Sequence, residues 1–231
     1  MNYFDSDKEI KQQYLTYIDQ KDFACIAAKA ALGRKQIHCM VADSMQCSKD
    51  DAAILRFLYD FIEEYRHSSE QYHSAAVIFK HPIIHDELVF EKLFWEKLQA
   101  LSNMDALHYS YDRRVGNDPA SPDFSFSLKQ EAFFIVGLHP ASSRATRQFQ
   151  YPTVVFNPHI QFEELRDLGK YEAMKKTIRK RDKAYSGTVN PMLNDFGDVS
   201  EVYQYSGRQY GTGWKCPLNI KHASVKDHTT A

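Results

Sequence analysis

Two histidines stand at the ends of apolar runs, where the chain is expected to turn. The first run ends in Leu138-His139-Pro140, and the second ends in Asn157-Pro158-His159. Sheet proteins present side chains at strand ends to a cleft. A neutral imidazole there can ligate a metal or a heme iron while an acceptor fixes its other nitrogen. Capping of the loop by hydrogen bonds to the backbone is the alternative for both histidines.

Arginines and acids around these runs suggest recognition of small charged molecules. Arg144 and Arg147 lie three residues apart, and guanidinium groups suit carboxylates or phosphates. A surface ion pair is the alternative. A loop rich in Gly and Pro carries acids beside tyrosines and an arginine, a composition that can seat a cationic amine or guanidinium. Its residues are Asp195, Asp198, Glu201, Tyr203, Tyr205 and Arg208, and loop solvation is the alternative.

Two further features have both a chemical and a structural interpretation. Cys216, between Trp214 and Pro217, can supply a thiolate to heme or simply pack as a buried thiol. The segment 166–183, which begins with Arg166, is basic. It is either a solvated face or a groove for an anionic cofactor or a redox partner. The sequence has no nucleophile elbow, no Walker loop, no dinucleotide-binding glycine motif and no zinc-protease helix.

Composition places the chain among ordinary enzymes. Its 231 residues are 43% hydrophobic, which is enough for one buried core. The formal charge of −1 gives no indication of general nucleic-acid binding. No run has the roughly 18 apolar residues of a membrane span, and the polar start is unlike a secretory signal. A cytoplasmic protein is therefore expected. Its cysteines form no CxxC pair and are expected to be free thiols: Cys25, Cys39, Cys47 and Cys216.

Hydrophobic periodicity predicts interleaved strands and helices. Strands are expected near residues 37, 75, 124, 132 and 153, and helices over 48–66, 86–101, 158–168 and 170–182. Asn157 and Pro158 have the residue types of a helix start, and Lys97 is expected to extend its charge to water. The pattern predicts an α/β fold (or α+β), one domain with a central mixed sheet flanked by helices. The domain is expected over 21–218, after a polar lead-in at 1–20 and before a flexible tail at 219–231.

Long segments of the carboxyl-terminal half resemble the YqcI/YcgG family in order and spacing. They are FFIVGLHPASSRATRQF, PTVVFNPHIQFEELRDLGKY, IRKRD, VNPMLNDFG, YQYSGR and GWKCP, and the resemblance covers roughly residues 20–218. Phe23-Ala24-Cys25 is similar to the family's Phe-Pro-Cys, with Ala in place of Pro. Carried over by position, the recurrent polar residues are His139, Arg144, Arg147, Asn157, His159, Gln161, Arg166, Asn190, Asp195, Tyr205, Arg208 and Cys216.

This resemblance implies a heme-dependent N-oxygenase. Members of that family include enzymes that hydroxylate a side-chain nitrogen of arginine or a related guanidino or amino compound in natural-product pathways, and many other members have no assigned substrate. The resemblance implies heme b, dioxygen, a small amino-acid or guanidino substrate and an external electron donor, without nucleic acid or membrane. A homodimer is the assembly that symmetry favours. The alternatives are a heme-binding or heme-sensing protein without turnover, and an anion-binding module that uses the basic segment 166–183.

Roles follow from the same resemblance. The alternatives for the iron ligand are His159, His139 and Cys216. The residues expected to bind the cofactor are Arg144, Arg147, Asn157 and Arg166, where the two first-named arginines hold heme propionates or the substrate carboxylate. The residues expected to act on the substrate are Asp195, Glu201, Tyr205 and Arg208. Asp195 or Glu201 is expected to pair with the cationic end of the substrate, and Tyr205 and Arg208 to shape the pocket.

Overall fold

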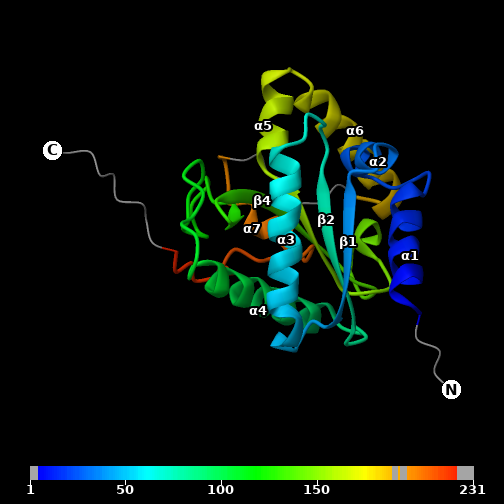
Figure 1. Ribbon diagram of the computed structural model, residues 1–231. Coiled ribbons are helices and arrows are strands. Elements are labelled where there is room, and N and C mark those ends of the chain that lie inside the picture. The colour runs from blue at the N-terminus through cyan, green and yellow to red at the C-terminus, as the bar shows by residue number, and fades with distance from the viewer. Residues whose placement is uncertain (1–4, 189–191, 193–196, 223–231) are drawn as a thin grey trace.

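A computed structural model describes residues 5–188, 192 and 197–222 of the chain, and Figure 1 shows their arrangement. Asp195 and Asn190 therefore lie outside the described residues. The strands are β1 (Ile37–Ser44), β2 (Ser74–His81), β3 (Phe126–Leu128), β4 (Glu131–Leu138) and β5 (Thr153–Pro158). The helices are α1 (Asp7–Asp19), α2 (Ile26–Gly33), α3 (Asp51–Arg66), α4 (Glu87–Asp105), α5 (Ile160–Asp167), α6 (Tyr171–Ser186) and α7 (Val202–Tyr205), with short 3-10 turns at Ser48–Asp50 and Ala145–Arg147.

The strands form one mixed sheet in the order β1-β2-β5-β4-β3. β1 and β2 are parallel and are joined by α3, whereas β2–β5, β5–β4 and β4–β3 are antiparallel pairs. Since a parallel pair needs a crossover and β4 follows β3 through a two-residue turn, both connection types occur in one sheet. The structure confirms the expected single α/β domain with a mixed sheet.

The alternation of side chains along β4 divides the core into two layers. Phe133 and Ile135 point into a large cluster covered by α3 and α4. Val136 and Leu138 point to the other face, which α1 and α2 cover (Figure 1). Because successive strand residues face opposite ways, any site on β4 must belong to one layer or the other. This alternation decides below which sequence-predicted residues can meet.

Residues 5–20 are part of the folded domain, which corrects the expected polar lead-in over the described part of this segment. α1 buries Ile10, Tyr14, Tyr17 and Ile18 against the sheet. These residues recur at helical spacing, so one face of the helix is apolar although its overall composition is polar. At the other end of the described chain, His222 is buried, and its Nε2 lies 2.8 Å from Asp105 Oδ2. Residues 219–222 therefore do not belong to a flexible tail.

Two local expectations are also wrong. Lys97 does not reach water: its side chain is 3% exposed, and its ammonium group binds Asp51 and the carbonyl oxygen of Cys47. A charge buried this deeply needs such a partner. Asn157 and Pro158 do not begin a helix but end β5, where the Asn157 amide donates to Phe134 O and accepts from the Ser74 hydroxyl. α5 begins at Ile160, since pairing with β4 holds Asn157 and Pro158 in the sheet.

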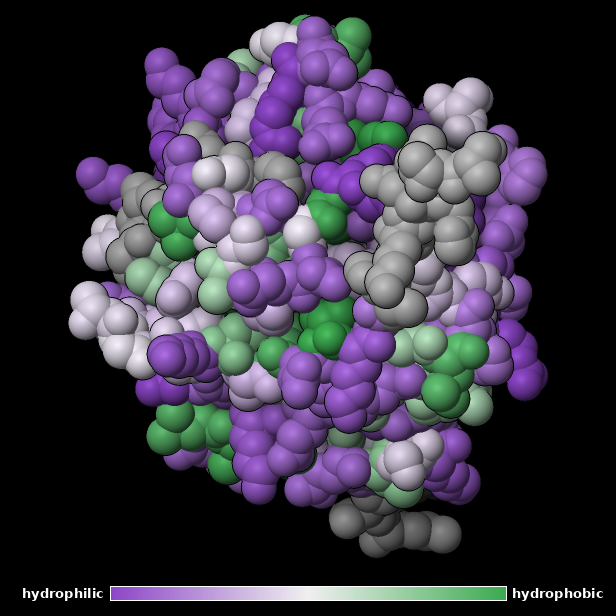
Figure 2. Space-filling view, turned by 90° about the vertical axis from the view of Figure 1, so that its left-hand side faces the viewer, coloured by the Kyte–Doolittle hydropathy of each residue, from purple (hydrophilic) through white to green (hydrophobic). Residues whose placement is uncertain are grey.

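The molecular surface agrees with the charged composition. Figure 2 shows a mostly hydrophilic face on which hydrophobic side chains are exposed in small separate areas. Among the helices of the described residues, none has both the length and the apolar character that crossing a bilayer requires.

Candidate functional site

A cavity of about 240 Å³ lies between α2, α6 and the sheet face opposite α3 and α4. Its floor consists of Phe134, Val136 and Leu138, which project from β4. Four residue steps along a strand give this floor a length of about 13 Å. Ala27, Ala28 and Ala31 of α2 face it, and short side chains at these positions leave the space open. The result is an elongated slot with a mostly apolar lining.

Two arginines stand at the Leu138 end of the slot. Arg144 is paired with Asp182 of α6 at 2.6 Å and also donates to Thr188 O. Arg147 has no carboxylate partner among the described residues. Its guanidinium instead donates to the carbonyl oxygens of Gly137, Gln204 and Tyr205. Loss of water around this group, together with the charge of Arg144, lowers the pKa of Arg147 to about 10, so it stays cationic at neutral pH.

The other end of the slot contains polar atoms without partners. His73 Nδ1 and Gln161 Oε1 are buried and have no hydrogen-bond partner within the described part of the chain, although both side chains line the cavity. Burial lowers the pKa of His73, which keeps its ring neutral. Asn157 lines the same end. Buried polar atoms of this kind call for a bound molecule or water, because an unmade hydrogen bond costs about 1–3 kcal/mol.

Cys25 also lines the cavity, and the sequence-based assignment of roles omitted it. It is the N-cap of α2, and its sulfur accepts the backbone N–H of Ala28 at 3.5 Å. Burial raises the pKa of the Cys25 thiol, while the Ala28 and Ala27 amides and the charge of Arg147 act in the opposite direction. The signal that could have identified it was the Phe23-Ala24-Cys25 tripeptide, because this is the segment that leads the chain into the slot.

A second polar site lies next to the slot, around the buried carboxyl group of Glu201. Its Oε1 accepts hydrogen bonds from the Ser125 hydroxyl at 2.7 Å and from the Tyr205 hydroxyl. Burial raises the pKa of Glu201 to about 8, and the two hydroxyls only partly offset this. Glu201 is therefore a protonated, neutral acid at pH 7, which makes it a proton store within a low-dielectric core.

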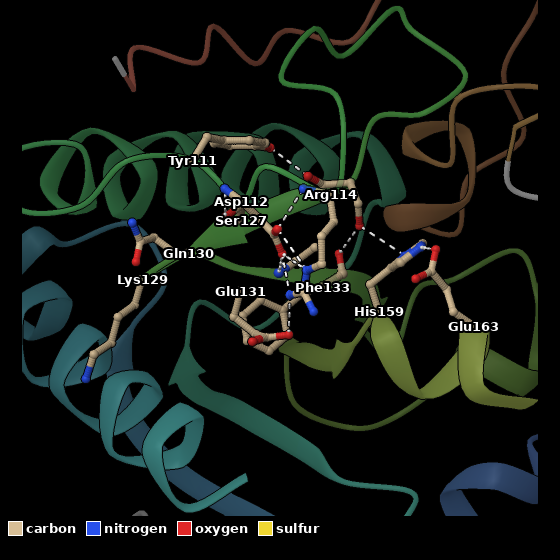
Figure 3. Close-up of polar contacts among 12 residues, drawn as sticks. Tyr111, Asp112, Arg114, Ser127, Lys129, Gln130, Glu131, Phe133, His159 and Glu163 are labelled. Carbon is tan, nitrogen blue, oxygen red and sulfur yellow. Dashed lines mark hydrogen bonds and ion pairs between the residues drawn. The ribbon is translucent and has the colours of Figure 1, made fainter. Parts of the chain in front are cut away.

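His159 connects this acid to the surface. Its Nδ1 lies 3.4 Å from Ser125 Oγ and 3.8 Å from Glu201 Oε2, and its Nε2 lies 3.5 Å from Glu163 Oε1. Figure 3 shows His159 directed toward Glu163 on α5, beside the cluster of Asp112, Arg114 and Glu131. Burial, with the charge of Arg166 as the next cause, lowers the pKa of His159 to about 4. A neutral imidazole between two carboxyl groups has the form of a proton relay.

α7 holds the two sites together. Glu201, the N-cap residue of α7, belongs to the acid site. At the other end of the helix, the carbonyl oxygens of Gln204 and Tyr205 accept hydrogen bonds from Arg147 of the slot. The Tyr205 ring packs edge-on against Phe134 at 5.7 Å, so one aromatic layer separates the acid from the slot. A change in the slot that moves Arg147 would therefore also act on α7.

The structure groups some sequence-predicted residues and separates others. Arg144 and Arg147 line one end of the slot and Asn157 the other, whereas His159, Glu201 and Tyr205 meet in the acid site. Arg166 stacks over Tyr171 at 4.3 Å and acts on the acid site through its charge. Neither Glu201 nor Arg208 lines the slot: the first is enclosed by hydroxyls, and the second is paired with Glu91 of α4. Pairing of Glu201 with a cationic substrate is thus not supported, because the carboxyl group is neutral and covered.

The three expected iron ligands do not converge. His139 follows β4 on the α4 side, where its ring stacks on Phe90 at 4.0 Å; neither ring nitrogen has a hydrogen-bond partner within the described ranges. His159 lies at the opposite end of the β4–β5 pair, about 20 Å away along the strand. Cys216 packs at the edge of the core, and burial raises the pKa of its thiol to about 12. In the described residues, no three His, Cys, Asp or Glu side chains gather in a way that could hold a metal ion.

Removing the Tyr205 hydroxyl is expected to destabilise the acid site. Tyr205→Phe deprives Glu201 of a donor and leaves the backbone N–H of Phe126 without its 3.1 Å acceptor, at a cost of about 1–2 kcal/mol. Chemical denaturation would measure this loss in the free energy of unfolding. Tyr203→Phe is the matched control, since the Tyr203 hydroxyl has no hydrogen-bond partner among the residues described and its loss should change stability by less than about 0.5 kcal/mol. Equal effects of the two variants would contradict this account of the acid site.

Comparison with known proteins gives a consistent family match. The model of the YqcI/YcgG family matches residues 14–219. The uncharacterized protein YqcI of Bacillus subtilis (strain 168) is 33% identical over 144 residues, which are 58% of this chain and 56% of that protein. The chain thus aligns with little more than half the length of YqcI. The uncharacterized protein YcgG of the same organism is 26% identical over 199 residues, 81% of this chain and 76% of that protein. No solved structure gives a significant match.

Proposed function

This chain belongs to the YqcI/YcgG family, and from that premise we propose that it is a heme-dependent N-oxygenase. Its substrate is an arginine-like amino acid or guanidino compound, which it hydroxylates on a side-chain nitrogen. In this reaction an N–H becomes N–OH, the second oxygen atom of dioxygen leaves as water, and an external donor supplies two electrons together with two protons. The observation that carries the proposal is the mostly apolar slot lined by a buried thiol, polar atoms without partners among the described residues, and two arginines.

The residue types that line the slot fit a heme in chemistry. A porphyrin is a flat apolar ring with two carboxylates on one edge, and the slot has apolar walls and arginines at one end. Its volume of about 240 Å³ is below the range of about 300–1,000 Å³ typical of pockets for drug-sized ligands. Heme binding therefore requires α2 or α6 to move outward from the sheet. When bound, the heme would supply the activation of dioxygen.

The protein's own residues would bind the carboxylates of the ligands, orient the substrate and supply protons to the slot. Arg147 is suited to a carboxylate, because its cationic group has no acidic partner among the described residues. Gln161 and Asn157 offer amide groups to a polar substrate at the opposite end. Gln161 also lines an open polar depression of about 800 Å³ on the surface, so it stands between solvent and the slot. His159 and Glu201 provide a route for protons from Glu163 to the aromatic wall of the slot.

Turnover with defined substrates tests this proposal. Heme-loaded protein is incubated with L-arginine, L-lysine or a guanidino acid, a reductant and dioxygen, and products are analysed by mass spectrometry. A gain of one oxygen atom that depends on dioxygen and on heme is the expected result. Heme binding without product from any of these compounds would favour the alternative, a heme-binding or heme-sensing protein without turnover. A protein that takes up no heme would overturn both.

A further inference from the structure

We infer that Cys25 is the side chain that ligates the heme iron, in place of His139, His159 and Cys216. The inference rests on the proposed function, because it names the ligand within the same slot. Cys25 lines the slot between the apolar walls, and none of the other three side chains does.

The position of Cys25 favours its thiolate form once a metal is present. Its sulfur stands at the amino end of α2, where it already accepts the Ala28 N–H at 3.5 Å. Backbone N–H groups and the helix dipole at such an end favour negative charge. Arg147 lies within electrostatic reach and adds a positive charge. Iron, when bound, would take the sulfur as its thiolate, and the thiol proton would leave to solvent.

A second, independent feature shows that the slot is built for a ligand. His73 Nδ1 and Gln161 Oε1 line it with no hydrogen-bond partner among described residues, although their side chains are only 2% and 5% exposed. Neither atom is explained by packing, since two unmade hydrogen bonds are costly. A bound molecule with polar groups at this end of the slot would satisfy both.

The other ligand candidates are worse placed. His139 belongs to the opposite layer of the sheet, where Phe90 covers the face of its ring. Gly137 on that side is so crowded that an added Cβ would lie 2.8 Å from the Phe90 ring. His159 is engaged in the acid site, and Cys216 packs at the edge of the α4-side core.

Spectroscopy of full-length variants tests the inference independently of activity. Wild-type protein and the variants Cys25→Ser, Cys25→His, Cys39→Ser and His139→Ala are titrated with hemin and then examined in the ferrous carbon monoxide form. We expect a long-wavelength, thiolate-type band in wild type, Cys39→Ser and His139→Ala. Cys25→Ser should lose that band and bind heme more than about 10-fold more weakly, since even outer-shell partners of a metal ligand are worth about 10–100-fold. Cys25→His should give an imidazole-type band, and this also shows that the protein still folds.

The remaining results would overturn either the assignment of the iron ligand or the proposed function. A Cys25→Ser variant that keeps the thiolate band and wild-type affinity would overturn the inference. So would an imidazole-type band in wild type that His139→Ala abolishes, although the proposed function would then stand. A wild-type protein that binds no heme at all would instead overturn the proposed function, on which the inference rests.

Discussion

Ala28→Leu is expected to weaken heme binding by about 100-fold or more, equivalent to roughly 2.8 kcal/mol, without unfolding the protein. Ala28 belongs to the wall of α2 that faces the floor of the slot. A leucine there adds three carbon atoms to space that a porphyrin would need. The empty volume accepts them, and leucine is nearly as good a helix former as alanine, so the free energy of unfolding should change by less than about 1 kcal/mol. Hemin titration and chemical denaturation measure the two quantities.

Ala30→Leu is the matched control for this variant. Ala30 is on the same helix but does not line the slot, so the same substitution there should leave heme affinity unchanged. Wild-type affinity in Ala28→Leu would show that heme binds elsewhere. Equal losses in both variants would indicate a general effect on α2 rather than occupation of the slot.

Glu201→Gln is expected to remove a pH dependence of stability that wild type shows above pH 6.5. Burial raises the pKa of Glu201 from 4.5 to about 8 in the folded state. Between these values the folded protein holds a proton that the unfolded chain has lost, so stability falls as pH rises, by about 1.4 kcal/mol per pH unit. Glutamine resembles the neutral acid and cannot ionise. The variant should therefore match wild type at low pH and be clearly more stable at pH 8.

Two histidines act in the opposite direction at lower pH. Burial lowers the pKa of His139 and of His159 from 6.5 to about 4. Between pH 4 and 6.5 the unfolded chain holds protons at these sites that the folded protein lacks, so their contribution to stability rises with pH. The combined curve should have a maximum near pH 6.5. In Glu201→Gln the descending side should disappear, and the rise below pH 6.5 should become steeper because the opposing contribution of Glu201, which begins near pH 4.5, is also lost.

Denaturation curves at pH 5–9 check this prediction. Glu164→Gln, on the exposed side of α5, is the control and should reproduce the wild-type profile. If wild type shows no decline between pH 6.5 and 8, then Glu201 is not a neutral acid in the folded protein. A proton route from Glu163 to the slot would then lose its central member.

Local periodicity predicted the elements well because it is a property of short segments. The continuous apolar run of β4 and the helical spacing of α3 can be read without knowing their neighbours, and both were predicted within a few residues. Arg144 and Arg147 follow β4 whereas Asn157 ends the antiparallel β5, so the strand ends alone place them at opposite ends of the sheet. Lys97 was misjudged because the position of Asp51 on another helix decides its exposure.

The slot could not be predicted, since it depends on which layer each residue faces. His139 and Leu138 are neighbours in the chain, yet the alternation of β4 sends one toward Phe90 and the other toward the slot. Cys25 and Arg147 are more than a hundred residues apart and meet only through the packing of α2 against the sheet. The neutral state of Glu201 likewise depends on burial by distant segments, and no local pattern records it.

The most direct measurement of the central claim is a hemin titration of the full-length protein, followed by absorption spectroscopy and hydrogen exchange of the complex. The account predicts one heme per chain with a defined Soret band, together with changed exchange rates in α2 and α6, which must move to admit the ring. Saturation at one heme with changes confined to α3 and α4 would place the heme on the other face of the sheet. That result, or the absence of saturable binding, would contradict the account.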